Sequence, residues 1–344
     1  MINVGIVGIG FMGMIHYLAY QKVRGAKVTA IATRERRKLA GDWRGIQGNF
    51  GPPGAMMDLR GVAAYEHWRD LLADPHIDLV DICLPPALHA SVAIAALRAG
   101  KHVLCEKPIS VAADDAVRMV KAAEKAGKLL LVGHVLPFFP EYAFARQLVE
   151  SGRYGRLLGG HFKRIISDPL WLKDFYDPVR VGGPVVDLLI HDAHFIRLLC
   201  GLPRAVFSTG RMRGDVVKFV NSQFLFDRPD LSVTAASGVI DQQGRGFTHA
   251  FEIYLERATL LYDSAVLAGE GVTPMPLTIL SSDGKVRRPK LKAVDAFVVE
   301  LSEATAAVAA GRPSKLLDCQ LARDALLLCH KQSQSVRQCR LVKV

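Results

Sequence analysis

One glycine-rich stretch near the start of the chain, VGIVGIGFMGMIH (residues 4–16), constrains the fold more than any other part of the sequence. An apolar run typical of a β-strand leads directly into Gly8, Gly10 and Gly13, and a helical pattern follows. In such a strand–turn–helix the first glycine allows the tight turn, the second lets backbone approach a pyrophosphate, and the third lets helix and strand pack closely. The pattern predicts a dinucleotide site formed by Gly8, Gly10, Phe11, Met12 and Gly13. The alternative is a tight turn without a ligand.

The chain alternates short apolar segments with helical ones over residues 1–125, which predicts an α/β fold with a doubly wound parallel sheet of the Rossmann type. Successive strand-like runs then fill 126–312, interrupted by a helical segment over 185–200. They predict an α+β domain with a large, open, mostly antiparallel sheet. The helical tail, 313–344, is expected to return to the first domain. An uncovered sheet face would need a partner, so we expect a homodimer or homotetramer.

Composition excludes several classes of protein. Of 344 residues 50% are apolar and 22% charged, which indicates an ordered globular chain large enough for two domains. We expect no secretory signal and no membrane span, because no apolar run reaches the roughly 18 residues a span requires. Six cysteines without CxxC spacing indicate reduced thiols and a cytoplasmic location.

The net charge of +11 raises the question of nucleic-acid binding, but the basic runs RERRK (34–38) and KVRRPKLK (285–292) contain no aromatic residues for base stacking. We therefore expect a solvated basic surface that attracts anions, such as the phosphates of a cofactor, rather than nucleic acid.

The second predicted strand ends in IATRERRK (31–38), where an acidic residue would select NAD by binding its ribose 2′-hydroxyl. Thr33 and Arg34 occupy that place, and Arg36, Arg37 or Lys38 could support them. A guanidinium pairs well with a 2′-phosphate, so NADP is favoured. Glu35 keeps NAD possible.

Three further segments carry a family resemblance: DLVDICLPPALHASVAIAALRAGKHVLCEKP (78–108), VGHVLPFFPEY (132–142) and GGPVVDLLIHDAHFIRLLCG (182–201). With the glycine motif they resemble the Gfo/Idh/MocA family of NAD(P)-dependent oxidoreductases. The resemblance implies a Rossmann domain, a second α/β domain with an open sheet, a site in the cleft between them, and oxidation of a secondary hydroxyl of a sugar or polyol, or the reverse reduction.

The resemblance also implies site residues. The lysine of the EKP motif corresponds to Lys107, and the aspartate and histidine of the second domain correspond to Asp187 and His191. The chain departs from many members at Pro137, where they carry arginine, and at His194, where they carry aspartate. Further cofactor contacts are expected from Leu84, Pro85, His89, Glu106 and Lys107, and substrate contacts from His134, Lys173, Tyr176, Arg180 and His194.

The chemistry of these side chains agrees with the resemblance. Hydride transfer from an alcohol needs a proton acceptor and a cation near the oxygen. Asp187 and His191 are four residues apart and so share a helix face. His191 would accept the proton, and Asp187 would orient the imidazole or the substrate. Lys107 would supply the positive charge. The resemblance also implies a tight turn at this place, so the Lys107–Pro108 bond is expected to be cis.

Other interpretations of the same residues remain open. Taken singly, EKP is compatible with a solvated turn, and a histidine in an apolar helix with a core position. The spacing Asp187, His191 and His194 is compatible with a divalent metal site, with His134 or Asp192 as a further ligand, although we expect no metal. A non-catalytic NADP-binding sensor with this fold is the third possibility.

Overall fold

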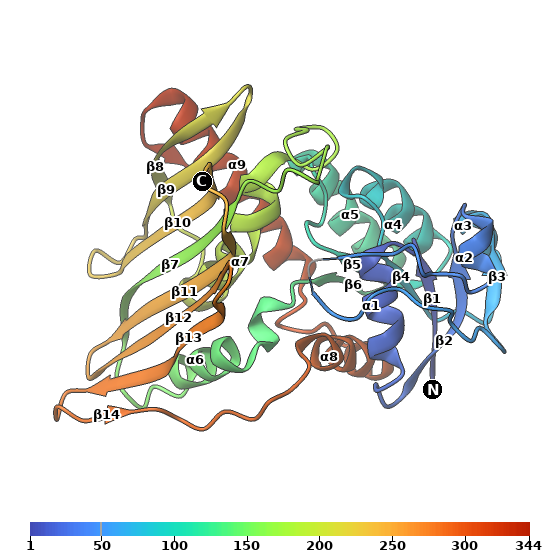
Figure 1. Ribbon diagram of the computed structural model, residues 1–344, viewed down its shortest axis with the longest axis horizontal. Coiled ribbons are helices and arrows are strands. Elements are labelled where there is room, and N and C mark those ends of the chain that lie inside the picture. The colour runs from blue at the N-terminus through green and yellow to red at the C-terminus, as the bar shows by residue number, and fades with distance from the viewer. Residues whose placement is uncertain (49) are drawn as a thin grey trace. The chain divides into compact units, whose positions relative to one another are not determined.

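The computed structural model describes residues 1–48 and 50–344, which form two compact units (Figure 1). Unit 1 comprises Met1–Phe138 and Val294–Arg323, and unit 2 comprises Phe139–Ala293 and Asp324–Val344. Among the described residues, no helix has both the length and the apolar character that crossing a bilayer requires.

Unit 1 is built on a six-stranded parallel sheet in the order β3-β2-β1-β4-β5-β6, as the alternating pattern predicts. Its strands are nearly continuous apolar runs, because helices cover a parallel sheet on both faces. The strands are β1 (Ile2–Val7), β2 (Ala26–Ala32), β3 (Ala63–Tyr65), β4 (Leu79–Ile82), β5 (His102–Glu106) and β6 (Leu130–Gly133). The helices are α1 (Phe11–Tyr20), α2 (Arg36–Leu39), α3 (Trp68–Ala73), α4 (His89–Arg98), α5 (Ala113–Ala126) and α8 (Ala296–Ala310).

Unit 2 is built on a nine-stranded sheet in the order β14-β13-β12-β11-β7-β10-β9-β8-β15. Neighbouring strands are antiparallel except β7 and β10, which run parallel, so the predicted mostly antiparallel sheet is confirmed. The strands are β7 (Leu157–Ser167), β8 (Ala205–Arg213), β9 (Val216–Leu225), β10 (Ser232–Ile240), β11 (Arg245–Leu255), β12 (Ala258–Leu267), β13 (Gly271–Ser281), β14 (Val286–Arg287) and β15 (Val342–Lys343).

Three helices cover one face of this sheet: α6 (Pro140–Glu150), α7 (Ile190–Cys200) and α9 (Cys319–Gln338). Tyr142 of α6 packs edge-on against Phe251 of β11, and the Ser208 amide of β8 donates to Ser335 Oγ of α9 at 2.8 Å. Side chains at alternate positions point to the opposite face, where Phe207 is 40% exposed although Val206 beside it is fully buried.

The division into units differs from the predicted boundaries at 125/126 and 312/313. Residues 126–138 belong to unit 1 because β6 pairs with β5 and completes the parallel sheet. The segment from Val294 also belongs there, since α8 packs on α1. The tail divides: residues to Arg323 group with unit 1, and those from Asp324 group with unit 2, where β15 pairs with β8.

Candidate active site

The loop after β1 has the geometry that the glycine motif predicts. Gly8 has φ of +99°, and a Cβ there would lie 2.6 Å from the carbonyl oxygen of Cys83. A Cβ on Gly13 would lie 2.1 Å from the Gly8 carbonyl oxygen, so α1 can approach the loop only with glycine at this position. A Cβ on Gly10 would meet no described atom within 4 Å. Backbone is therefore accessible at the helix N-terminus, where a phosphate would meet the amides of the first turn.

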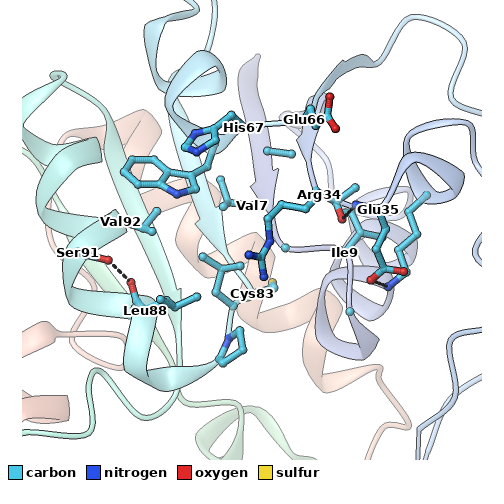
Figure 2. A pocket seen from close by; sticks show the side chains of 18 residues that line it. Val7, Ile9, Arg34, Glu35, Glu66, His67, Cys83, Leu88, Ser91 and Val92 are labelled. Carbon is cyan, nitrogen blue, oxygen red and sulfur yellow. Dashed lines mark hydrogen bonds and ion pairs between the residues drawn. The ribbon is translucent and has the colours of Figure 1, made fainter. Parts of the chain in front are cut away.

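A cavity of about 420 Å³ opens beside this loop, as Figure 2 shows. It lies at the carboxyl ends of β1, β2 and β4, and the strand order reverses direction between β1 and β4. Nucleotides bind at this point in doubly wound sheets, and the volume is in the range of small-molecule sites. The lining includes Gly8, Ile9, Gly10, Thr33, Arg34, Glu35, Lys38, Glu66, His67, Trp68, Cys83, Leu84, Pro85, Leu88, Ser91 and Val92.

The rim of the cavity beyond β2 is charged. Arg34 extends across the pocket in Figure 2, and Lys38 of α2 is a second lining cation. The Lys38 ammonium pairs with Glu35 Oε1 at 2.7 Å, and the Glu35 amide donates to Thr33 Oγ1 at 3.3 Å. The acidic side chain of this loop is therefore already held by a cation.

The structure divides the predicted cofactor residues into two groups. Gly8, Gly10, Thr33, Arg34, Leu84 and Pro85 line the cavity, whereas Phe11, Met12, Gly13, Arg37, His89, Glu106 and Lys107 are not among its lining residues. Of the three basic residues expected to support Arg34, namely Arg36, Arg37 or Lys38, Lys38 lines the cavity. The sequence analysis also missed His67 and Trp68, because they follow the three-residue strand β3, which is too short to show a period.

His89 lies behind the cavity wall. Its ring is fully buried, with Nδ1 2.8 Å from the Pro108 carbonyl oxygen and Nε2 2.7 Å from that of Leu84. Burial lowers the pKa of His89, so the imidazole stays neutral and donates one hydrogen bond. Its position suits it to hold the Leu84 and Pro108 loops in place.

Lys107 follows the last residue of β5, and the predicted cis bond between Lys107 and Pro108 is confirmed. The Lys107 amide donates to Glu106 Oε2 at 3.0 Å. Glu106 is only 6% exposed, whereas Lys107 is half-buried at the end of the strand. Glu106 is thus part of the unit 1 interior, and Lys107 reaches the surface.

In unit 2, Asp187 lies in a π-helical turn, Val185–Leu189, that leads into α7. The predicted helix over 185–200 is confirmed, but the wider turn changes the i, i+4 relation expected for Asp187 and His191. Such π-helical turns are frequent at functional sites. Asp187 and His191 are half-buried, whereas His194 is fully buried.

A buried ion pair that the sequence analysis did not find fixes α7 on the sheet. Arg164 of β7 contacts both carboxylate oxygens of Asp192, at 2.8 and 3.1 Å, and both side chains are almost completely buried. Asp192, considered above as a metal ligand, is therefore paired with a guanidinium. It is adjacent to His191, so this two-point contact also fixes the start of α7.

The other predicted substrate residues lie in different surroundings. His134 follows β6 and is fully buried in unit 1. In unit 2, Lys173 is exposed and Arg180 pairs with Asp174 at 2.6 Å. Tyr176 lies under the Arg213 guanidinium, 3.9 Å from the ring centre, and burial raises its pKa to about 12.

The described residues do not bring Asp187, His191 and His194 together as a metal-ligand group. Over residues 1–48 and 50–344, the only such cluster is His16, Asp81 and Cys83 in unit 1. The metal interpretation of the α7 residues thus has no support from the described geometry.

Two family models match the chain in succession. A model described as "Oxidoreductase family, NAD-binding Rossmann fold" matches residues 2–134, and the GFO/IDH/MocA C-terminal domain matches residues 142–261. Together they cover most of both units.

Relatives of known activity match over part of their length. Levoglucosan dehydrogenase of Pseudarthrobacter phenanthrenivorans is 30% identical over 58% of this chain and 51% of its own, and myo-inositol 2-dehydrogenase of Thermotoga maritima is 31% identical over 58% and 55%. The matches thus span about half the length of these relatives.

Solved structures show the same fold over the whole chain. Aldose-aldose oxidoreductase from Caulobacter crescentus, complexed with glycerol, superposes with a TM-score of 0.82 at 20% identity, covering 100% of this chain and 99% of that one. Levoglucosan dehydrogenase in complex with NADH gives 0.81 at 22% identity, with the same coverage. The glycine loop, the cavity at the strand reversal, the open sheet and both family models agree: the chain belongs to the Gfo/Idh/MocA family of oxidoreductases.

Proposed function

We propose that the chain is an NAD(P)-dependent oxidoreductase that transfers hydride between a nicotinamide and a secondary hydroxyl or carbonyl of a sugar or polyol. The observation that carries the proposal is the cavity beside Gly8 and Gly10, which combines open backbone at a helix N-terminus with a cationic rim. The named activities of the relatives, levoglucosan and myo-inositol dehydrogenation, support the substrate class.

The chain's own residues would bind the dinucleotide and manage the substrate's proton. The bound nicotinamide supplies the hydride acceptor or donor. The first-turn amides of α1 hold the pyrophosphate, and Leu84 and Pro85 wall the cavity. Lys107 stabilises negative charge on the reacting oxygen, His191 accepts the hydroxyl proton, and Asp187 orients the imidazole or the substrate.

NADP is the preferred cofactor in this proposal. Arg34 and Lys38 line the rim beyond β2, where the adenosine ribose binds in this type of fold. The Glu35 carboxylate is paired with Lys38, which leaves it less suited to a ribose 2′-hydroxyl. A guanidinium at this place would favour a 2′-phosphate.

The cofactor proposal is tested by fluorescence titration of the purified protein with NADPH and NADH, followed by a panel of levoglucosan, myo-inositol and related sugars read at the nicotinamide absorbance. We expect tighter binding of NADPH and turnover of at least one panel member. Binding of both nucleotides without turnover of any substrate would favour the sensor instead.

Substitution of Arg34 tests the cofactor preference. Arg34→Ala should weaken NADPH binding about tenfold or more, because a charge-assisted contact is lost, and change NADH binding far less. Arg24→Ala removes an exposed arginine outside the cavity lining and is the matched control. An equal loss of affinity for NADPH and NADH would show that Arg34 does not bind the 2′-phosphate.

The open face of the unit 2 sheet is proposed to pair with a second copy, giving a homodimer or homotetramer. A reducing compartment is proposed as well, because all six cysteines are free thiols and Cys83, Cys105 and Cys329 are buried.

A further inference from the structure

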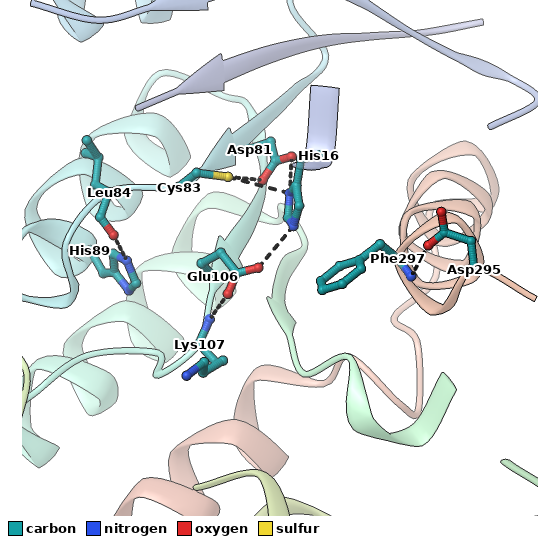
Figure 3. A network of polar contacts seen from close by, with 9 residues as sticks. All are labelled: His16, Asp81, Cys83, Leu84, His89, Glu106, Lys107, Asp295 and Phe297. Carbon is teal, nitrogen blue, oxygen red and sulfur yellow. Dashed lines mark hydrogen bonds and ion pairs between the residues drawn. The ribbon is translucent and has the colours of Figure 1, made fainter. Parts of the chain in front are cut away.

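A buried polar network lies behind the end of β5, and the proposed mechanism does not use it (Figure 3). His16 is fully buried, and its Nδ1 is 2.8 Å from Asp81 Oδ2. Its Nε2 is 3.0 Å from Glu106 Oε1, an ion-pair contact rather than a directed hydrogen bond. The Cys83 thiol completes the group, 3.5 Å from His16 Nδ1 and 3.6 Å from Asp81 Oδ1.

Unit 1 brings these residues together from three elements. His16 is on α1, three residues after Gly13, and so faces the sheet where the glycine allows close approach. Asp81 is on β4 and Glu106 ends β5, the neighbouring strand. The contacts of His16 join it to residues 65 or more positions away in the chain, and the fold therefore has to form before the network does.

The network needs a cation at His16. Two carboxylates approach its two ring nitrogens, and Coulomb attraction in a dry interior then favours the doubly protonated ring. Burial alone lowers the pKa of His16, but the Asp81 carboxylate and the Cys83 sulfur raise it, and the net pKa lies well above the ordinary 6.5. The imidazolium thus offsets part of the negative charge of Asp81 and Glu106.

Helix α8 closes the network from another side. It contributes Phe297, whose ring centre is 6.2 Å from that of His16, and the fully buried Glu300. Burial raises the pKa of Glu300 well above 4.5, and the nearby Glu106 raises it further, so Glu300 holds its proton. Tyr20 of α1 is also buried, and it keeps its hydroxyl proton because burial raises its pKa. His16 is therefore the cation of a network whose other members are acidic or neutral.

We propose that His16 is a positioning residue for Lys107: it fixes the Glu106 carboxylate, whose other oxygen holds the Lys107 amide. The chain of contacts is short. Glu106 Oε1 faces His16 at 3.0 Å, and Glu106 Oε2 accepts the Lys107 N–H at 3.0 Å. The Lys107 side chain leaves this contact on the side away from His16 in Figure 3. The assignment rests on the proposed function only in that Lys107 is the group being positioned.

Loss of the imidazolium would release Glu106. A neutral residue at position 16 leaves Asp81 and Glu106 without their buried countercharge, which is costly, and removes the contact that holds Glu106 Oε1. The Lys107 amide then loses a fixed acceptor. A displacement of about 1 Å at a reacting group can lower turnover on the order of 100-fold.

The test compares His16→Gln with His102→Gln. His102 is a second histidine of unit 1, on β5, that accepts the Leu129 amide at 3.1 Å and lies outside the network. Two measurements need no substrate: proton–nitrogen correlation spectra of ¹⁵N-histidine-labelled protein between pH 6 and 9, and hydrogen exchange of the segment 104–110.

We expect one histidine to keep both ring protons to higher pH than the other histidines, and its signal to be absent in His16→Gln only. Exchange in the segment 104–110 should accelerate at least tenfold in His16→Gln and stay unchanged in His102→Gln. With a substrate from the panel, His16→Gln should lower kcat on the order of 10- to 100-fold while the Kd for NADPH changes less than threefold.

Several results would overturn the assignment. A neutral His16 at pH 7, unchanged exchange in 104–110, or wild-type kcat in His16→Gln would each contradict it, as would stoichiometric zinc bound by His16, Asp81 and Cys83 in elemental analysis.

If His16→Gln does not fold, Glu106→Gln serves instead. The amide oxygen of this glutamine can still accept the Lys107 N–H, but the negative charge is lost. Wild-type kcat and wild-type exchange in Glu106→Gln would also contradict the proposal. Failure to bind either nucleotide would refute the proposed function, but the spectra and the exchange rates would still report on the network.

Discussion

Glu300 shows at the scale of a single residue how unit 1 departs from an ordinary apolar core. It lies on α8 with no exposed surface, and neither carboxyl oxygen has a hydrogen-bond partner among the described residues. A buried carboxyl group in this state is stable only when protonated. The residue therefore lowers stability at neutral pH, where the unfolded chain would release the proton.

Glu300→Gln should therefore raise the free energy of unfolding in a pH-dependent way. The folded pKa is raised above the ordinary 4.5, so the native state retains a proton that the unfolded state loses as pH rises. The loss in free energy of unfolding caused by Glu300 is absent below about pH 4.5 and grows by about 1.4 kcal/mol per pH unit until the folded carboxyl group ionises. Denaturant unfolding of both proteins at pH 4.5 and pH 7 measures this loss. A Glu300→Gln variant no more stable than wild type at pH 7 would contradict a protonated Glu300.

At the scale of elements, the strand–loop–helix unit of β1 and α1 separates two uses of glycine. Gly13 is required for packing, because a Cβ would overlap the Gly8 carbonyl oxygen at 2.1 Å. Gly10 has φ of −98°, which any residue adopts, and open space beside it. The protein itself therefore does not require glycine at position 10, whereas a bound phosphate would.

Alanine at these two positions should consequently have opposite effects. Gly10→Ala should keep the stability of the protein and weaken NADPH binding roughly tenfold or more, since a methyl group enters the space a phosphate needs. Gly13→Ala should lower stability by about 1–3 kcal/mol or more through overpacking. Thermal unfolding and NADPH titration separate the outcomes; an unaltered Kd in Gly10→Ala would place the phosphates elsewhere.

Most helices and strands, but not all, could be predicted from the sequence. The parallel sheet, the helix over 185–200 and the antiparallel sheet followed from apolar periods and from the family resemblance. β3 could not be found in this way, because three residues show no period. The His16 network was missed since each member, taken alone, resembles a helix or strand interior residue and only the packing of α1 on β4 and β5 unites them.

For the whole molecule, the exposed face of the nine-stranded sheet predicts self-association. Phe207 and Tyr254 lie on this face, and both are more than a third exposed although their strand neighbours are buried. Sedimentation velocity should show a dimer or tetramer, and the double substitution Phe207→Asp and Tyr254→Asp should shift it toward smaller species, because charges would be buried without partners. A wild-type monomer at micromolar concentration would contradict the proposed assembly.

At the scale of the whole molecule, the proposed mechanism draws on residues of both units, because Lys107 belongs to unit 1 and Asp187 and His191 belong to unit 2. The most direct test is to measure kcat and the Kd for NADPH together in Lys107→Ala, with the exposed Lys125→Ala of α5 as the matched control. We predict that kcat falls about 100-fold or more in Lys107→Ala while the Kd stays near wild type, since the lysine stabilises charge that develops in the reaction. A collapse of NADPH binding with undiminished turnover per bound cofactor would contradict this account.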